Sequence, residues 1–307
     1  MQTNKILIFG RVGQVGWELR HKLACLGNIV SVEFPEVDFT KPDSLRSVVR
    51  AEQPTVIVNA AAYTAVDKAE TEQELALAIN GTAPGVLAEE ARQMGSLLVH
   101  YSTDYVFNGS GTTPWKESDT PAPLNVYGQT KLAGDLTIAA SGCDHLIFRT
   151  SWVYGARGSN FLLTMLRLAQ ERSELSIVDD QIGAPTSSEC IAQATADVLA
   201  QVLAPAGKGI DGRSGIYNLT NGGETSWCGF ARAIFDRAHT LLSTPQPSVQ
   251  PIPTSAFPRP ATRPTNSRLN PQQLADSFGV RLPHWELGLD LILESMAEGS
   301  SAFRRNG

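Results

Sequence analysis

The sequence predicts an α/β protein: a Rossmann-type, doubly wound parallel sheet followed by a smaller C-terminal α/β domain. Short, almost continuous aliphatic runs alternate with longer segments of helical periodicity through the first half of the chain, and a glycine-rich turn directly follows the first run. After about residue 155 the runs become shorter and proline becomes more frequent. We therefore expect residues 1–155, with later returning segments, to form the larger domain and residues 156–307 to form most of the smaller one.

Five aliphatic runs mark the expected strands of the sheet. They lie at residues 5–9, 29–33, 55–59, 97–101 and 145–149. Between the first two runs, Val15, Leu19 and Leu23 recur every four residues, as in an amphipathic helix. Alternation of strands and helices predicts right-handed crossovers and hence a parallel sheet.

The second half of the chain carries fewer and shorter expected elements. We expect helices at residues 160–172, 227–238 and 285–297, and short strands at 176–178 and 216–219. Residues 244–271 are rich in proline, which lacks an amide donor and fixes φ, so this stretch cannot be regular helix or central strand. One interpretation of this stretch is a linker. The alternative is a segment with a role of its own, because an inert spacer has no need of Phe257, Arg259, Arg263 and Arg268.

The composition excludes several classes of protein. The 307 residues are 42% hydrophobic and 18% charged, and the net charge of -6 gives no electrostatic reason to expect nucleic acid or an anionic membrane as partner. Neither a signal peptide nor an apolar run of bilayer length is visible, so we expect a soluble, cytoplasmic protein. The four cysteines are far apart, which argues against a disulfide framework or zinc site.

A turn with the spacing Gly-x-x-Gly-x-x-Gly joins the first strand to the first helix. Glycine at positions 10, 13 and 16 lets the backbone approach a pyrophosphate, whose charge then meets the helix N-terminus. The standard dinucleotide fingerprint is Gly-x-Gly-x-x-Gly, so an ordinary tight turn remains the alternative. The candidate cofactor-binding residues of this turn are Gly10, Gly13, Gln14, Val15 and Gly16.

An acidic residue, Glu33, ends the second strand 17 residues after Gly16. A carboxylate there can accept hydrogen bonds from a ribose hydroxyl and repels a 2′-phosphate, which favours NADH over NADPH. The alternative is a solvent-facing glutamate at a strand end. Asp38 and Phe39 are candidates to flank the adenine.

Polar side chains that suit carbonyl chemistry follow the fourth strand. Thr103 and Asp104 lie just past its carboxyl end, where open α/β sheets place ligands. Tyr127 and Lys131 lie four residues apart, hence on one face of a helix. A nearby cation favours tyrosinate, so we expect the pKa of Tyr127 to fall from about 10 towards neutrality, where the phenol can exchange a proton with a carbonyl oxygen. Turn capping and an ordinary surface helix are the alternatives.

These motifs together resemble the extended short-chain dehydrogenase/reductase superfamily, and longer stretches narrow the resemblance to the dTDP-4-dehydrorhamnose reductase family. The stretches are Ser-Thr-Asp-Tyr-Val-Phe at 102–107, Pro-Leu-Asn-Val-Tyr-Gly at 123–128, Phe-Arg-Thr-Ser-Trp-Val-Tyr at 148–154, Asp-Gln-Ile-Gly-Ala-Pro-Thr at 180–186 and Arg-Pro-x-x-Ser-x-Leu at 263–269. The resemblance runs from about Lys5 to about Ser295.

The resemblance implies reduction, by NADH or NADPH, of the C4 keto group of a dTDP-linked 4-keto-6-deoxyhexose, dTDP-4-dehydro-β-L-rhamnose. Tyr127 would protonate the oxyanion, Lys131 would lower the pKa of Tyr127 and hold the nicotinamide ribose, and Thr103 would bond the carbonyl. Asp104 and Trp152 would line the sugar site, and the proline-rich arginines the diphosphate wall. Further matches to cofactor-contacting positions are Val15, Ala62, Tyr63, Thr64 and Tyr101.

The resemblance also raises the question of a metal. Some family members bind Mg²⁺ at a subunit contact through three glutamates, and Glu18 and Glu189 match two of these positions. Ser295 stands at the third, with the candidate Glu294 beside it. One residue turns a helical side chain by about 100°, so exposed glutamates are the alternative, and both a monomer and a homodimer stay open.

Two other functions remain open at this stage. A sugar-nucleotide epimerase or dehydratase of the same superfamily would retain its cofactor through the cycle and oxidise no NADH in net terms. A non-catalytic regulatory subunit would bind nucleotide without turnover, and fold alone does not exclude it.

Overall fold

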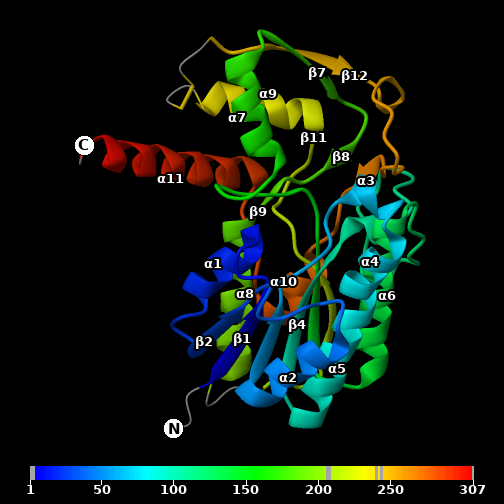
Figure 1. Cartoon of the computed structure of the whole chain (residues 1–307). Helices are drawn as coiled ribbons and strands as arrows, with labels where there is room; N and C mark the ends of the chain where they lie inside the picture. The colour runs from blue at the N-terminus through cyan, green and yellow to red at the C-terminus, as the bar shows by residue number, and fades with distance from the viewer. Residues whose placement is uncertain (1–3, 205–208, 239–240, 243–244, 306–307) are drawn as a thin grey trace.

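A parallel sheet forms the lower half of the molecule in Figure 1, a computed structural model that describes residues 4–204, 209–238, 241–242 and 245–305. Its strand order is β10-β5-β4-β3-β1-β2. The strands are β1 (Lys5–Phe9), β2 (Asn28–Val32), β3 (Val56–Asn59), β4 (Leu97–Thr103), β5 (His145–Thr150) and β10 (Gly215–Asn218), and each pairs with its neighbours in parallel. The predicted doubly wound α/β fold is confirmed.

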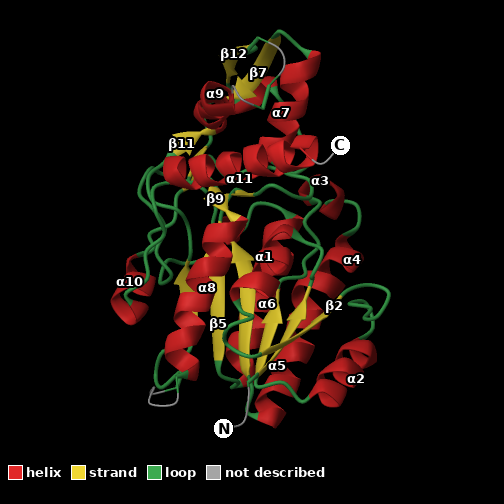
Figure 2. Cartoon of the chain, turned by 90° about the vertical axis from the view of Figure 1, so that its left-hand side faces the viewer, coloured by secondary structure: helices red, strands yellow, loops and turns green. Residues whose placement is uncertain are grey.

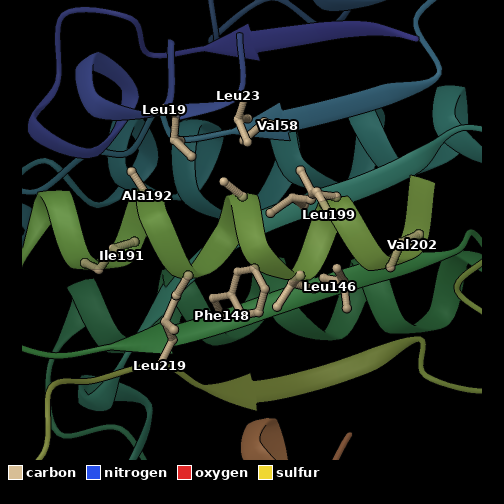
Figure 3. Packing of buried hydrophobic residues seen from close by; sticks show 14 of the residues in the cluster. Leu19, Leu23, Val58, Leu146, Phe148, Ile191, Ala192, Leu199, Val202 and Leu219 are labelled. Carbon is tan, nitrogen blue, oxygen red and sulfur yellow. The ribbon is translucent and has the colours of Figure 1, made fainter. Parts of the chain in front are cut away.

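Helices cover both faces of this sheet because its strands are apolar on both sides. On β1, Ile6 and Ile8 face one core while Leu7 and Phe9 face the other. The first core lies under α1 (Gln14–Lys22) and α8 (Ser188–Leu203), and the second under α2 (Pro42–Glu52), α5 (Ala83–Met94) and α6 (Val126–Ser141). Figure 3 shows the first core, where Leu19 of α1 and Leu23, which directly follows this helix, lie near side chains of α8 and the strands.

A second group of elements lies beyond the carboxyl edge of the sheet and has its own apolar core. This core is formed by α7 (Phe161–Glu171), α9 (Trp227–Arg237) and α11 (Trp285–Arg305), close to the ranges we expected for three helices. Figure 2 shows α7 and α9 above the sheet with α11 crossing between them and the sheet. The short strands here are β7 (Glu174–Val178) with β12 (Ser248–Ile252), β6 (Val153–Tyr154) with β9 (Thr186–Ser187), and β11 (Thr225–Ser226), β8 (Ile182–Gly183) and β13 (Asn266–Ser267).

The chain crosses between the two groups more than once. After β9 it returns to the sheet as α8, and β10 and α10 (Gln272–Phe278) return later. These are returning segments of the kind that we expected, and the boundary at residue 155 stays a prediction. The short elements that complete the described chain are α3 (Val66–Ala69), α4 (Gln73–Leu77), the π-helical turn η1 (Ala78–Thr82) and the 3-10 turns η2 (Asp104–Val106) and η4 (Thr254–Ala256).

The proline-rich stretch is part of the fold, so the linker interpretation is wrong for residues 245–271; Thr244 lies outside the described residues. β12 contains Pro251 and forms a two-stranded sheet with β7, an edge position in which a residue without an amide donor is tolerated. Asn266 of β13 is buried and donates to the carbonyl of Thr113 at 2.9 Å. Across the ranges that the structure describes, no helix combines the length and the apolar character that a membrane span requires.

Candidate active site

The glycine turn after β1 is built for close approach of a ligand to the backbone. Gly10 has a φ of +88°, and a side chain there would lie 2.6 Å from the amide nitrogen of Ala61. A side chain at Gly16 would overlap the carbonyl oxygen of Gly10. Within the described chain, no side chain caps α1 and its first turn carries no acid, so the free amides there can receive an anionic group. The turn therefore fits the pyrophosphate of a dinucleotide.

The two other predicted residues of this turn have structural partners. The Gln14 carboxamide oxygen accepts a hydrogen bond from Asn160 at 2.9 Å, which ties the loop before α7 to the start of α1. Val15 packs against the core under α1. Their contact with a cofactor stays a prediction.

Glu33 directly follows β2 and lies beside the glycine turn, where its carboxylate accepts a weak hydrogen bond from the Val12 amide at 3.4 Å. Arg11, which sequence reasoning missed, donates to the carboxylate of Glu36 at 2.6 and 3.0 Å and to the carbonyl of Ser31 at 2.9 Å. An acid and a cation thus stand side by side at the end of β2. This is the position at which doubly wound folds read the adenosine ribose.

The next two predicted residues, Asp38 and Phe39, make their contacts in and near the turn before α2. The Asp38 carboxylate accepts from the amide and the hydroxyl of Thr40, at 3.0 and 2.6 Å, and these bonds lower its pKa. The ring of Phe39 meets the ring of Phe9 edge-on at 5.7 Å. Contact of Asp38 and Phe39 with an adenine stays a prediction.

The segment after β3 is held by a residue that the sequence patterns did not reveal. Asn80, on the π-helical turn η1, accepts from the amide of Tyr63 at 2.9 Å and donates to its carbonyl at 3.0 Å. Asn80 also donates to the hydroxyl of Thr130 on α6 at 3.2 Å. Ala62 and Thr64 flank Tyr63 and are exposed. The available signal in the sequence was an asparagine inside an apolar helical stretch, because a polar side chain there needs hydrogen-bond partners. π-Helical turns such as η1 are frequent at functional sites.

Thr103, Asp104 and Tyr127 come together at the carboxyl end of β4. The hydroxyl of Thr103 donates to the Asp104 carboxylate at 3.0 Å, and its interaction with the Tyr127 phenol opposes part of the rise in the pKa of Tyr127. Asn125 fixes the start of α6 by accepting from the Gly128 amide at 2.8 Å, which places Tyr127 in the first turn.

Asp104 is nearly inaccessible to solvent, and burial raises its pKa to about 6. One of its carboxylate oxygens is buried without a hydrogen-bond partner among the described residues, and an interaction with the Ser267 side chain opposes part of the rise in the pKa of the carboxyl. An unpartnered buried oxygen is suited to a donor from a ligand, such as a sugar hydroxyl.

The expected fall in the pKa of Tyr127 is not observed. Burial raises the pKa of Tyr127, and the nearby charge of Asp104 adds to the rise. The side chain of Lys131 makes its polar contacts elsewhere: its Nζ donates to the Tyr101 carbonyl at 2.6 Å and lies 3.1 Å from Nε2 of His100. Burial lowers the pKa of Lys131 to about 8. The helical spacing was right, but it does not specify where a long side chain ends.

Tyr101 contributes its backbone rather than its ring to this site. Its hydroxyl hydrogen-bonds the hydroxyl of Thr195 on α8 at 2.8 Å, which directs the phenol towards the core under α1 and α8. Its contact with a cofactor stays a prediction.

Trp152 follows β5 and stands in an aromatic stack. Its backbone has a φ of +50°, which is strained for a residue with a side chain. The ring stacks on Trp227 with centroids 3.7 Å apart, and Trp227 donates its indole N–H to Gln181 at 3.2 Å. The stack joins the segment after β5 to α9, and its hydrogen bond connects it to the 180–186 stretch. Sequence reasoning missed Trp227 because tryptophan at a helix start carries no distinctive pattern.

The arginines of the proline-rich stretch are paired with carboxylates of the protein. Arg263 donates to both oxygens of Asp67 on α3 at 2.8 and 3.0 Å, and Arg268 donates to both oxygens of Glu224 at 2.6 and 3.1 Å. Arg259 lies over the ring of Phe257 at 4.4 Å. A diphosphate would have to compete with these partners.

The glutamates considered for Mg²⁺ do not form a metal centre within the described chain. Glu18 and Glu189 lie near each other: burial, then repulsion from Glu189, raises the pKa of Glu18. Glu189 accepts from the Lys22 ammonium at 2.9 Å. Glu294 lies on α11, and no group of three or more His, Cys, Asp or Glu side chains is arranged to hold a metal in the residues that the structure describes.

The fold and this site together define an oxidoreductase of the extended short-chain dehydrogenase/reductase class. The family model for the RmlD substrate binding domain matches residues 4–298. The chain is 47% identical to the dTDP-4-dehydrorhamnose reductase of Salmonella typhimurium over 299 residues, covering 95% of this chain and 97% of that one. The chain belongs to the dTDP-4-dehydrorhamnose reductase family.

Two further relatives support this assignment. The dTDP-4-dehydrorhamnose reductase of Burkholderia thailandensis is 48% identical over 295 residues, covering 95% of this chain and 99% of the relative. The dTDP-4-dehydrorhamnose reductase of Bacillus anthracis, solved in complex with NADP, is 33% identical and superposes with a TM-score of 0.86, covering 96% of this chain and 100% of that one.

Proposed function

We propose that the protein catalyses the NAD(P)H-dependent reduction of the C4 keto group of dTDP-4-dehydro-β-L-rhamnose to give dTDP-β-L-rhamnose, the last step of dTDP-L-rhamnose biosynthesis. The observation that carries this proposal is the meeting of Thr103, Asp104 and Tyr127 at the edge of the sheet that also bears the glycine turn. Relatives of nearly full length carry the same activity in their names.

The bound cofactor, held by the glycine turn and the end of β2, would supply the hydride. Tyr127 gives its phenolic proton to the C4 oxygen, and its raised pKa keeps that proton in place until negative charge develops on the substrate. Thr103 turns its one hydroxyl proton from the Asp104 carboxylate to the same oxygen. Asp104 accepts a hydrogen bond from a sugar hydroxyl through its unpartnered oxygen, and the ring of Trp152 supports the sugar.

The decisive experiment mixes the purified protein with dTDP-4-dehydro-β-L-rhamnose and either reduced cofactor. We expect one NADH or NADPH to be oxidised per sugar reduced, because the hydride leaves with the product. Binding of cofactor without oxidation would instead support the regulatory function, and conversion of sugar without net oxidation would support an epimerase or dehydratase.

The first prediction concerns the proton donor. We expect Tyr127→Phe to bind cofactor normally and to lower kcat by about 100-fold or more, because general acid catalysis contributes about 10²–10⁴-fold. Tyr217→Phe is the matched control, since Tyr217 of β10 donates to the Arg213 carbonyl and lies in the core under α8. Initial rates and NADH titration measure both effects, and full turnover by Tyr127→Phe would remove this residue from the mechanism.

The end of β2 carries groups that suit either reduced cofactor. Glu33 favours NADH, whereas the neighbouring Arg11 is a cation of the kind that receives a 2′-phosphate, and a relative was solved with NADP. We therefore retain both cofactors. Bound Mg²⁺, a homodimer rather than a monomer, and a cytoplasmic location stay predictions.

A further inference from the structure

The ring of Trp152 contacts two segments that come from other parts of the chain. It stacks on Trp227 of α9, with ring centroids 3.7 Å apart and 12° between the ring planes. It also lies against Gly183 of β8, where the first atom of a side chain would be 2.8 Å from Cε2 of the indole. The missing side chain at Gly183 therefore leaves the space that the indole of Trp152 fills.

The ring of Trp227 is itself fixed by a hydrogen bond and by another ring. Its indole N–H donates to the carboxamide oxygen of the buried Gln181 at 3.2 Å. The carboxamide nitrogen of Gln181 donates to the Thr254 hydroxyl at 3.1 Å, and that hydroxyl gives its own proton to Asp180 at 2.6 Å. This sequence of donors and acceptors sets the orientation of the carboxamide. The ring of Phe161, at the start of α7, lies 4.6 Å from the ring of Trp227.

Aromatic contacts continue from Trp227 into the second core. Phe161 stacks on Phe230 with centroids 5.5 Å apart, and Phe230 meets Trp285 edge-on at 5.9 Å. Both Phe230 and Trp285 are buried in the core that α7, α9 and α11 form. Since Trp152 follows a strand of the main sheet, the stack with Trp227 connects the sheet to this second core.

We propose that Trp227 is a positioning residue that holds the indole of Trp152 in the orientation required by the sugar of the substrate. The φ of +50° at Trp152 is unfavourable for a residue with a side chain, and such a conformation persists only where surrounding contacts outweigh its cost. The stack with Trp227 supplies a contact of this kind. The inference rests on the proposed function, in which Trp152 supports the sugar, and Trp227 acts through Trp152.

The test compares the binding of dTDP-β-L-rhamnose and of dTDP by calorimetry, in the presence of reduced cofactor so that no turnover occurs. We expect Trp227→Ala to weaken binding of dTDP-β-L-rhamnose by about tenfold or more and that of dTDP by about threefold at most, because only the first ligand carries the sugar that Trp152 supports. A general loss of structure would weaken both ligands equally and would overturn the proposal.

Two further variants separate positioning from packing. Trp227→Phe keeps an aromatic face against Trp152, and we expect it to restore most of the affinity for dTDP-β-L-rhamnose. Trp285→Phe is the matched control, because it removes an indole from the same core and its ring meets Phe230 and His284. We expect Trp285→Phe to bind both ligands as the unmutated protein does. A loss confined to dTDP-β-L-rhamnose in Trp285→Phe as well would contradict the proposal.

A spectroscopic signature tests the stack even if Trp227→Ala does not fold. Two stacked indoles couple their electronic transitions and give paired circular dichroism bands of opposite sign in the far ultraviolet. We expect these bands in the unmutated protein and in Trp285→Phe, and we expect Trp227→Phe to lack them. Their persistence in Trp227→Phe would overturn the proposal.

The outcomes also separate this inference from the proposed function. Failure of the unmutated protein to bind dTDP-β-L-rhamnose would overturn the proposed function and this inference with it. Equal affinity of the unmutated protein and Trp227→Ala for dTDP-β-L-rhamnose would overturn this inference alone.

Discussion

The shifted pKa of Asp104 has a consequence for the pH dependence of stability that can be measured. Burial raises its pKa from 3.8 to about 6, and the unfolded chain keeps the ordinary value. Above about pH 6 the folded protein therefore holds a buried carboxylate, whereas at pH 3 both states bind the proton. Ionisation of Asp104 thus destabilises the fold as pH rises from about 4 to 6, and the full effect is present above about pH 6.

We predict that Asp104→Asn raises the free energy of unfolding at pH 8 by up to about 3 kcal/mol, the equivalent of the pKa rise, and much less at pH 3. Turnover should fall at the same time, because a carboxamide replaces the unpartnered acceptor. Urea unfolding at the two pH values measures the first effect and initial rates the second. Asp211→Asn, at an exposed position, is the control; an equal gain at both pH values would contradict the argument.

Sequence spacing predicted which side chains meet at this scale, but not how they behave. The end of a strand marked Thr103 and Asp104, helical spacing joined Tyr127 to Lys131, and the resemblance to a family implied that the two groups act on one carbonyl. The protonation of Tyr127 and the contacts of Lys131 depend on burial and on His100, which lies 31 positions away. Local patterns contain no information on such a pair.

At the scale of elements, the join between β1 and α1 depends on the absence of two side chains. We predict that Gly16→Ala weakens NADH binding at least tenfold and lowers stability by about 1–3 kcal/mol, because the new methyl group overlaps the Gly10 carbonyl and the turn must shift. Fluorescence titration with NADH and urea unfolding measure the two effects.

Gly215→Ala supplies the control for this prediction. Gly215 lies on β10, and an added methyl group there meets nothing within 4 Å among the described residues. We expect NADH affinity and stability close to those of the unmutated protein. Unchanged NADH affinity in Gly16→Ala would show that the cofactor does not depend on the shape of this turn.

Prediction of secondary structure succeeded for strands that are buried on both faces, because these appear as aliphatic runs. It failed for elements whose buried residues follow no clear period. The strands of the main sheet were visible as aliphatic runs. The helix α8 was not predicted, because its buried positions include Thr195 and several alanines and extend around much of its circumference. Two-residue strands such as β8 and β9 are shorter than any periodic pattern can reveal.

At the scale of the whole molecule, side-chain pairs join segments that are far apart in the sequence. Asp67 of α3 and Arg263 are 196 residues apart, and their paired hydrogen bonds connect a helix near the main sheet to the proline-rich segment. The pair lowers the pKa of Asp67 and is partly exposed, with side-chain exposures of 29% and 23%. Exposure to solvent reduces the contribution of such a pair to stability.

We predict a coupling energy of about 1 kcal/mol between these two side chains in a double-mutant cycle of Asp67→Asn and Arg263→Gln. Urea unfolding of the unmutated protein, both single variants and the double variant measures it. The exposed pair of Arg167 and Glu171 within α7 is the comparison, where we expect at most about 0.5 kcal/mol. Equal coupling in both pairs would show that the long-range connection adds nothing.

The arrangement of the whole chain was the least predictable level. The order of the strands in the sheet depends on contacts between segments that are distant in the sequence. β10 returns to pair with β5, and the residues of these two strands do not indicate this pairing beyond their apolar character. The resemblance to a family implied the two-part architecture that local patterns could only suggest.

The common direction of the strands also governs how the protein can be attached to a support. β1 begins at Lys5, on the amino edge of the sheet, whereas the glycine turn, Thr103 and Trp152 all follow carboxyl ends. A tether ahead of β1 would leave the catalytic edge facing the solution. A tether beyond α11 would instead hold the support on the side of the molecule where α11 passes between the sheet and the second core. We expect protein that is immobilised through α11 to turn over more slowly than protein that is immobilised ahead of β1.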